Sequence, residues 1–198
     1  MNALSLSYYI IHKYNDITPM KLQKLLYYLK VWGLVSDAFT VDTEFKKWAY
    51  GPVSSEIYQA YKQYSSAVIP KAAVLPVKLP TGLKPSIDFV LDCYVVYSAV
   101  TLSAMTHQEK PWQKTPVNKV ITDKKILKYY SQQPFAKNFP FNPQKPFYPP
   151  QTDMYSAYIF DMDSKDAEGV LMYSSYEEYQ KYQLKAKKSI SKIIKTLA

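Results

Sequence analysis

Six prolines lie between residues 134 and 150, and they constrain the chain most because no helix can run through them. Proline lacks a backbone N–H and clashes with the preceding helical turn, so a segment this rich in proline ends a helical domain. We therefore predict an extended linker over residues 132–150. It separates a domain over residues 1–131 from a C-terminal appendage over residues 151–198.

The segment after Thr18 carries the clearest helix signal in the chain. Thr18 can act as the N-cap, and Pro19 suits the first helical position. The apolar residues that follow recur at helical spacing and predict a core-facing stripe of Leu22, Leu25, Leu26, Leu29 and Trp32. Gly33 is expected to cap the C-terminal end of this helix.

Shorter patterns complete the predicted fold. Residues 45–50 alternate between apolar and polar and predict a small strand, and Pro52 is expected to open the next helix. Further helices are predicted over residues 3–14, 86–97, 102–108 and 122–130. We therefore expect a mainly α fold, in which a compact helical domain contains a small β element.

The C-terminal appendage has a different pattern. Residues 155–160 and 170–173 predict two strands of a β-hairpin around an acidic turn. Ser175 and Glu178 have the spacing of a capping box, which indicates a helix from there to the C-terminus. The appendage is therefore predicted to be a hairpin followed by a helix.

Composition excludes several classes of function. The single cysteine rules out an internal disulfide, and only four glycines are present, so a glycine-rich phosphate loop is excluded. All 25 basic residues are lysine, and the formal net charge is +9. Lysine lacks the bidentate fork of arginine, so sequence-specific nucleic-acid binding is disfavoured. No secretory leader or bilayer-length apolar run is found, and a cytoplasmic location is expected without membrane contact.

The sequence offers little for catalysis. His12 and His107 are far apart, and neither has a second histidine at ligand spacing. Cys93 with His107 could form a nucleophile and base, but Cys93 lies in an apolar helical segment that indicates a buried thiol. Glu109 beside His107 suggests acid–base chemistry or, alternatively, hydrogen bonds that order a loop. We expect no enzymatic activity, no metal and no cofactor.

Three motifs in a fixed order remain. The first contains Lys21, Leu22, Gln23, Lys24, Leu25, Leu26, Tyr27 and Tyr28, the second Trp48, Tyr50, Gly51, Pro52, Val53 and Tyr58, and the third Thr106, His107, Glu109, Pro111 and Trp112. Together they resemble the Panacea domain, the SocA-like antitoxin family, over roughly residues 2–131. The resemblance implies a cognate toxin protein as partner, with toxins related to translation-inhibiting small alarmone synthetases as one class.

The resemblance leaves the mode of action open. The chain could occlude its toxin, deliver it to a cellular protease, or act as a DNA-binding autoregulator. It also leaves the oligomeric state open.

The motif residues are interpreted mainly as scaffold. The leucines, Trp48 and Trp112 are expected in the core, whereas Gln23 and the lysines are expected to face outward or to cap neighbouring elements. Motifs shared by antitoxins of unrelated toxins should hold the fold, because different toxins need different contacts.

Toxin contact is instead predicted for the proline-rich segment and for the C-terminal unit over residues 153–198. The candidates in the segment are its aromatic residues Phe135, Phe139, Phe141, Phe147 and Tyr148. Prolines limit their freedom, which lowers the entropy cost of ordering them against a partner. The alternative is that these aromatics hold the segment against the protein's own surface.

Overall fold

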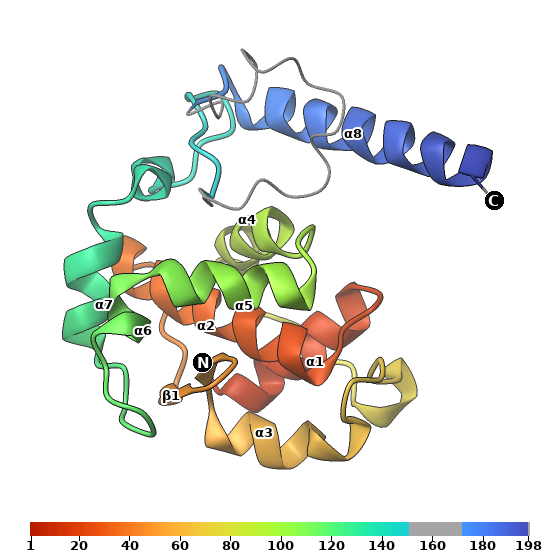
Figure 1. Ribbon diagram of the computed structural model, residues 1–198. Coiled ribbons are helices and arrows are strands. Elements are labelled where there is room, and N and C mark those ends of the chain that lie inside the picture. Colours follow the sequence, from red (N-terminus) through yellow and green to blue (C-terminus); the bar gives the residue numbers. More distant parts are fainter. Residues whose placement is uncertain (151–171, 198) are drawn as a thin grey trace. The chain divides into compact units, whose positions relative to one another are not determined.

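The computed structural model describes residues 1–150 and 172–197, and the chain divides into two compact units, Met1–Gln132 (unit 1) and Gln133–Ala198 (unit 2). Unit 1 is mainly helical with a small antiparallel sheet, as predicted (Figure 1). Its elements are α1 (Ala3–Lys13), α2 (Pro19–Ser36), β1 (Lys46–Trp48), β2 (Gly51–Val53), α3 (Ser55–Tyr61), α4 (Lys84–Tyr94), α5 (Ala99–Gln108), α6 (Lys110–Gln113) and α7 (Asp123–Tyr130). Short 3₁₀ turns occupy Lys62–Tyr64 and Lys71–Ala73.

Helix α2 is the centre of unit 1. It starts as predicted, with the Thr18 side chain accepting a hydrogen bond from the Lys21 N–H and Pro19 in the first turn. All residues from Leu22 to Leu29 are buried, which includes the predicted leucine stripe. The helix is covered by α1, α3, α4, α5, α7 and β2. A helix buried on every side must place its polar side chains inside the protein too.

Gly33 does not cap α2, contrary to the prediction. The helix continues to Ser36 and ends at Asp37, which has the left-handed conformation (φ 53°). Gly33 instead allows close packing, because a Cβ there would lie 2.5 Å from the Phe39 carbonyl oxygen and 2.8 Å from its ring. A glycine is required at this position because Phe39 packs directly against the helix there.

The predicted small strand is confirmed as β1, but Pro52 lies in β2 and does not open a helix. The two strands pair in antiparallel register, with Trp48 opposite Gly51 and Lys47 opposite Pro52. On its other side β1 pairs with residues 118–121, where Lys47 N–H donates to the Lys119 carbonyl (3.0 Å). Helix α3 begins only after Ser54, so the chain stays extended through the proline.

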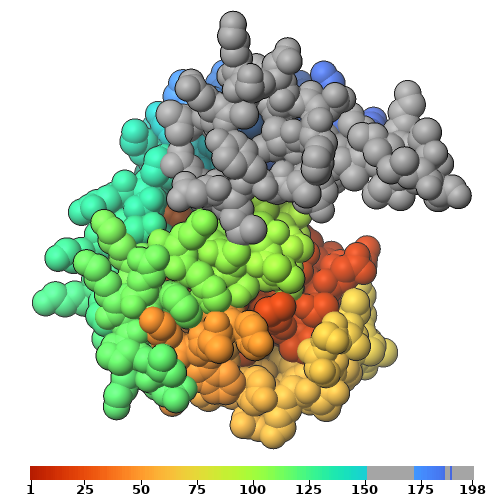
Figure 2. Space-filling view, in the orientation of Figure 1, coloured from red at the N-terminus to blue at the C-terminus, as the bar shows by residue number. Residues whose placement is uncertain are grey.

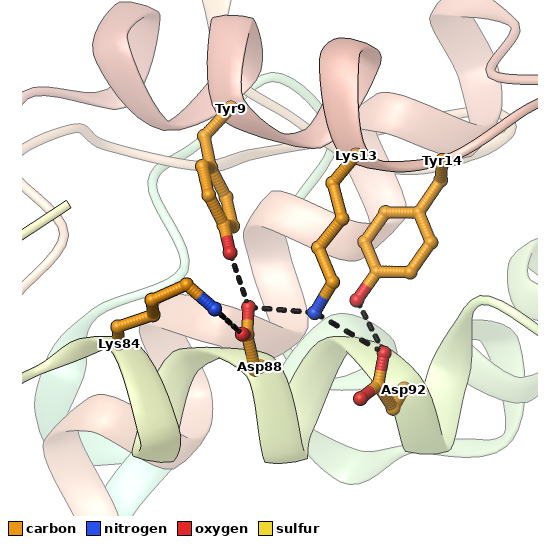
Figure 3. A network of polar contacts seen from close by, with 6 residues as sticks. All are labelled: Tyr9, Lys13, Tyr14, Lys84, Asp88 and Asp92. Atoms are coloured by element: carbon orange, nitrogen blue, oxygen red, sulfur yellow. Dashed lines mark hydrogen bonds and ion pairs between the residues drawn. The ribbon is translucent and has the colours of Figure 1, made fainter. Parts of the chain in front are cut away.

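A polar network joins α1 and the adjoining Tyr14 to α4 (Figure 3). The Tyr9 hydroxyl donates to Asp88 (2.6 Å), and Lys13 forms an ion pair with the same carboxylate (2.7 Å). The Tyr14 hydroxyl donates to Asp92 (2.5 Å). Burial opposes the charge of Asp88, but hydrogen bonds from Lys13, Lys84 and Tyr9 outweigh it and hold the pKa of the carboxyl below its usual value.

Helices α4 and α5 complete the cover over α2. Ile87, Val90 and Leu91 of α4 and Leu102 of α5 are fully buried. Among the described residues no single helix is long and apolar enough to cross a membrane; only α4 and α5 taken together, bent by 96°, reach that length and hydropathy.

Unit 2 contains a 3₁₀ turn (Pro134–Asn138) and helix α8 (Tyr176–Leu197). Residues 134–150, predicted as an extended linker, fold against the start of α8. Phe147 and Tyr173 exchange backbone hydrogen bonds of 2.9 and 2.8 Å, and the Asn138 side chain bonds to both backbone groups of Tyr148. Most of the predicted hairpin, residues 155–160 and 170–171, lies outside the described residues.

The predicted capping box at the start of α8 is present, except that the Glu178 carboxylate binds Ser174 and not Ser175. The Ser175 hydroxyl accepts a hydrogen bond from the Glu178 N–H (3.1 Å). The Glu178 carboxylate reaches back one residue further than expected, to the N–H (2.7 Å) and hydroxyl (2.6 Å) of Ser174. The result is still a closed first turn.

Truncating Leu26 to alanine is expected to destabilise unit 1 by about 2–5 kcal/mol, because its side chain is fully buried in α2 and a cavity would remain. Urea denaturation followed by circular dichroism measures the loss. Leu75→Ala is the matched control, since Leu75 is 73% exposed in the same unit and its truncation should have little effect. Equal stability of the two variants would contradict the central position of α2.

Candidate functional site

The three sequence motifs meet in unit 1 where α2 crosses the β1–β2 hairpin and α5. Gln23 is the first link between them. Its side-chain oxygen accepts from the Ser54 N–H (2.8 Å), and its amide donates to the Ser54 carbonyl (3.1 Å). The side chain is buried, so both of its polar atoms are satisfied by the backbone that follows β2. Gln23 therefore caps a neighbouring segment, one of the two roles expected for it.

Lys24 is the second link, and it is almost completely buried with 1% of its surface exposed. Its ammonium donates to the Pro52 carbonyl (3.0 Å). Burial lowers the pKa of Lys24 to about 7, because the charged form loses its hydration. This lysine therefore holds the hairpin against α2, and its amino group points into the protein and not toward solvent.

Gly51 is where the three motifs touch. Its φ of 103° is a conformation that other residues rarely adopt. A Cβ at this position would lie 2.6 Å from Thr106 Oγ1 and 2.7 Å from Lys24 Cε. The Thr106 hydroxyl in turn donates to the Ser103 carbonyl within α5 (2.7 Å). Helix α2, β2 and α5 can approach this closely only because residue 51 has no side chain.

Glu109, between α5 and α6, joins the third motif to the first. One carboxylate oxygen accepts from the Tyr28 hydroxyl (2.9 Å), and the other accepts from the Tyr130 hydroxyl. Both tyrosines are buried. Burial raises the pKa of Glu109 to about 8, although the two hydroxyl donors oppose the shift. Glu109 thus orders this junction through hydrogen bonds, the structural role considered for it.

Tyr130 was not singled out from the sequence as part of this cluster. It ends α7 and packs edge-on against Trp32 (5.5 Å between ring centroids) and Tyr27 (6.4 Å). Tyr28 stacks on Tyr94 of α4 at 4.0 Å. No local pattern marks a tyrosine at the end of a helix as the partner of a distant carboxylate, so only the fold could identify it.

His107 lies against the indole of Trp112, with ring centroids 4.1 Å apart. Burial and the nearby Lys24 lower the pKa of His107, although a backbone hydrogen bond at Ala49 opposes the shift. In the described part of the chain no hydrogen-bond partner is found for its buried Nε2. A neutral, stacked imidazole of this kind fills space between α5 and α6.

Cys93 is fully buried in α4. Across residues 1–150 and 172–197, no group of three or more His, Cys, Asp and Glu side chains is placed to hold a metal ion.

The aromatic members of the second and third motifs lie at the surface. Trp48 and Trp112, predicted as core residues, are only half-buried, and the fully buried indole is that of Trp32. Trp48 packs edge-on against Tyr58 of α3 (5.0 Å), and Trp112 Nε1 donates to the Trp48 carbonyl (3.2 Å). Tyr50, at the hairpin turn, is 74% exposed. The turn brings these rings outward because the opposite side of the hairpin faces α2.

The remaining motif residues have structural positions. Those with buried side chains are Leu22, Leu25, Tyr27, Pro52, Val53 and Pro111, and Lys21 is half-buried at the surface of α2.

The toxin-contact candidates of the proline-rich segment belong to unit 2. Phe135 and Phe147 are 2% exposed, and Phe147 packs against Tyr179 of α8 (4.6 Å). Phe139, Phe141 and Tyr148 are half-buried. The two buried rings form the interior of unit 2, so direct toxin contact remains a prediction for the half-buried residues.

Gly51→Ala is expected to destabilise unit 1 by about 2–5 kcal/mol, because the methyl group adds both backbone strain and a close contact with Thr106 and Lys24. Thermal unfolding measures the effect. Gly82→Ala is the matched control, since no atom lies within 4 Å of a Cβ built there. If the two variants unfolded alike, the close approach of the three motifs would be wrong.

Glu109→Gln is expected to change how stability depends on pH. The folded pKa of about 8 lies above the usual 4.5, so ionised Glu109 costs the folded state stability increasingly as pH rises from about 4.5 to 8. Glutamine cannot ionise, so the stability of the variant relative to the parent should increase across this range, by about 4 kcal/mol at pH 8.

Urea denaturation of both proteins at pH 5, 6, 7 and 8 measures this difference. Glu44→Gln, which alters an exposed carboxylate, is the control. A constant difference between Glu109→Gln and the parent across these pH values would contradict the raised pKa of Glu109.

Comparison with known proteins agrees with the motifs. Residues 22–113 match the family model described as antitoxin SocA-like, Panacea domain. The match contains the second and third motifs whole and the first from Leu22 onward. Neither the curated proteins nor the solved structures give a match. Over residues 22–113 the chain is therefore similar to the Panacea domain of the SocA-like antitoxin family.

Proposed function

We propose that this protein is an antitoxin that neutralises a cognate toxin by direct protein–protein contact. The similarity to the Panacea domain carries the proposal, since its family is that of an antitoxin. A toxin that stops translation, of the small alarmone synthetase class implied by the resemblance, is our first candidate. Both proteins would meet in the cytoplasm.

The use of polar groups within the motifs supports binding over catalysis. Gln23, Lys24 and Glu109 all direct their polar atoms toward other parts of unit 1. An active site needs such groups turned toward a substrate. What the motifs present outward is aromatic surface, which suits a protein interface.

The reading frame adjacent to this one supplies the test, because toxin and antitoxin are expected to be encoded side by side. Expression of that product alone should arrest growth, and co-expression of the present chain should restore it. The two proteins should also co-purify. Growth arrest that persists although both proteins are abundant would refute the antitoxin proposal.

Two controls separate the modes of action. In cells lacking the housekeeping proteases, rescue should persist with the toxin still present, because occlusion does not require degradation. Loss of rescue there would favour delivery to a protease. A gel shift with the DNA upstream of the gene tests autoregulation, and lysine-only contacts should weaken steeply with salt.

A further inference from the structure

Four aromatic side chains of the motifs reach the surface on the β1–β2 hairpin and on the neighbouring α3 and α6, and we call them the aromatic face: Trp48, Tyr50, Tyr58 and Trp112. Tyr50 is 74% exposed and Tyr58 41% exposed, while the two indoles are half-buried. In the space-filling view, residues 40–55 (orange) reach the surface beside the α5–α6 region (green) (Figure 2). A cluster of large exposed rings is a common mark of an interaction site.

Hydrogen bonds from α5 and α6 fix the hairpin backbone that carries two of these rings. The Tyr50 carbonyl accepts a hydrogen bond from the Ser103 hydroxyl (2.9 Å), and the Trp48 carbonyl accepts from Trp112 Nε1 (3.2 Å). The backbone of the hairpin is therefore fixed to α5 and α6 while the rings remain at the surface. A preorganised surface loses little conformational entropy when a partner binds.

Lysines border the face on the side of α6 and α7. This lysine band consists of Lys46, Lys47, Lys110, Lys114, Lys119, Lys124, Lys125 and Lys128. Two contacts connect parts of the band to each other or to the face. The Lys47 ammonium lies 4.1 Å from the Trp112 ring centroid, and the Lys125 ammonium donates to the Lys114 carbonyl (2.9 Å).

Few acids offset this band. Asp123 of α7 forms an ion pair with Lys30 (3.2 Å), and Glu109 is turned inward to its tyrosines. The exposed acids Glu44 and Glu56 lie next to the start of α3, where the Thr43 and Ser54 hydroxyls meet at 2.8 Å. The face is therefore strongly basic along its α6–α7 border.

We propose that the aromatic face and the lysine band together form the toxin-binding surface, and that the toxin presents an acidic surface to them. The inference rests on the antitoxin function proposed above. Exposed tyrosine and tryptophan are the residues that most often anchor protein interfaces, and flanking charges steer an oppositely charged partner.

Nucleic acid is the competing partner, because aromatic rings and lysines can also hold a single strand. The protein partner is favoured because no arginine is available to grip phosphates in bidentate fashion, and because residues 22–113 are similar to an antitoxin family.

The test measures affinity between the purified full chain and the purified product of the adjacent reading frame, by calorimetry. Tyr50→Ala removes an exposed ring, and Lys114→Glu with Lys119→Glu reverses two exposed charges of the band. Each should weaken binding roughly tenfold or more without changing the melting temperature of the free chain. For the charge variant, affinity should also depend less on salt than it does for the parent.

Matched controls come from elsewhere in unit 1. Leu75→Ala removes a side chain as exposed as Tyr50, and Lys71→Glu with Lys78→Glu reverses two exposed lysines of the loop before α4. Both controls should bind at parental affinity. Phe139→Ala with Phe141→Ala tests the contact predicted for unit 2.

Each contrary result has a distinct meaning. If the parent chain does not bind, the proposed antitoxin function and this inference both fail. The inference alone fails if the parent binds and the face variants retain parental affinity, or if only the Phe139 and Phe141 variant loses binding. It also fails if the Tyr50 and lysine variants lose binding to a fluorescent single-stranded oligonucleotide at physiological salt but keep parental affinity for the toxin.

Discussion

The burial of Lys24 is the interaction on which the arrangement of unit 1 depends. An ammonium group inside a helix that is covered on all sides needs an acceptor, and the Pro52 carbonyl supplies it. That bond keeps residues 51–53 extended against α2, and α5 then closes over them only because Gly51 has no side chain. Beside this contact, the Gln23–Ser54 hydrogen bonds fix the start of α3, and Glu109 ties the α5–α6 junction to Tyr28.

The parts of the fold that depend on local chemistry could be predicted from the sequence. The start of α2 rests on Thr18 and Pro19, and its leucine stripe on helical spacing alone. The strand β1 and helix α7 after Thr122 also have signals within their own segments. The resemblance to the Panacea domain could be recognised for a related reason, since each motif is a short run of neighbouring residues.

The features that could not be predicted depend on partners far away in sequence. Gly33 looked like a helix end, yet Phe39 returns across it. Residues 134–150 have the composition of a linker because prolines exclude a long helix, but Phe147 packs against Tyr173 and Tyr179, which lie far along the chain. In the site, Gln23 and Lys24 lie between Leu22 and Leu25, and helical spacing predicts that such polar residues face solvent. They are buried because other elements cover α2 on every side.

A motif residue can hold the fold through its backbone and still leave its side chain at the surface. At Tyr50 the backbone carbonyl is bound by Ser103 while the ring is 74% exposed, and at Trp48 the carbonyl is bound by Trp112 while the indole lies at the surface beside Tyr58. In each of these residues the backbone carbonyl is bound within the fold, whereas the side chain lies at the surface. A framework of this kind can present the same rings to different partners. Discrimination between toxins would then fall to exposed positions that hold nothing in place, such as the side chains of Lys114 and Lys119.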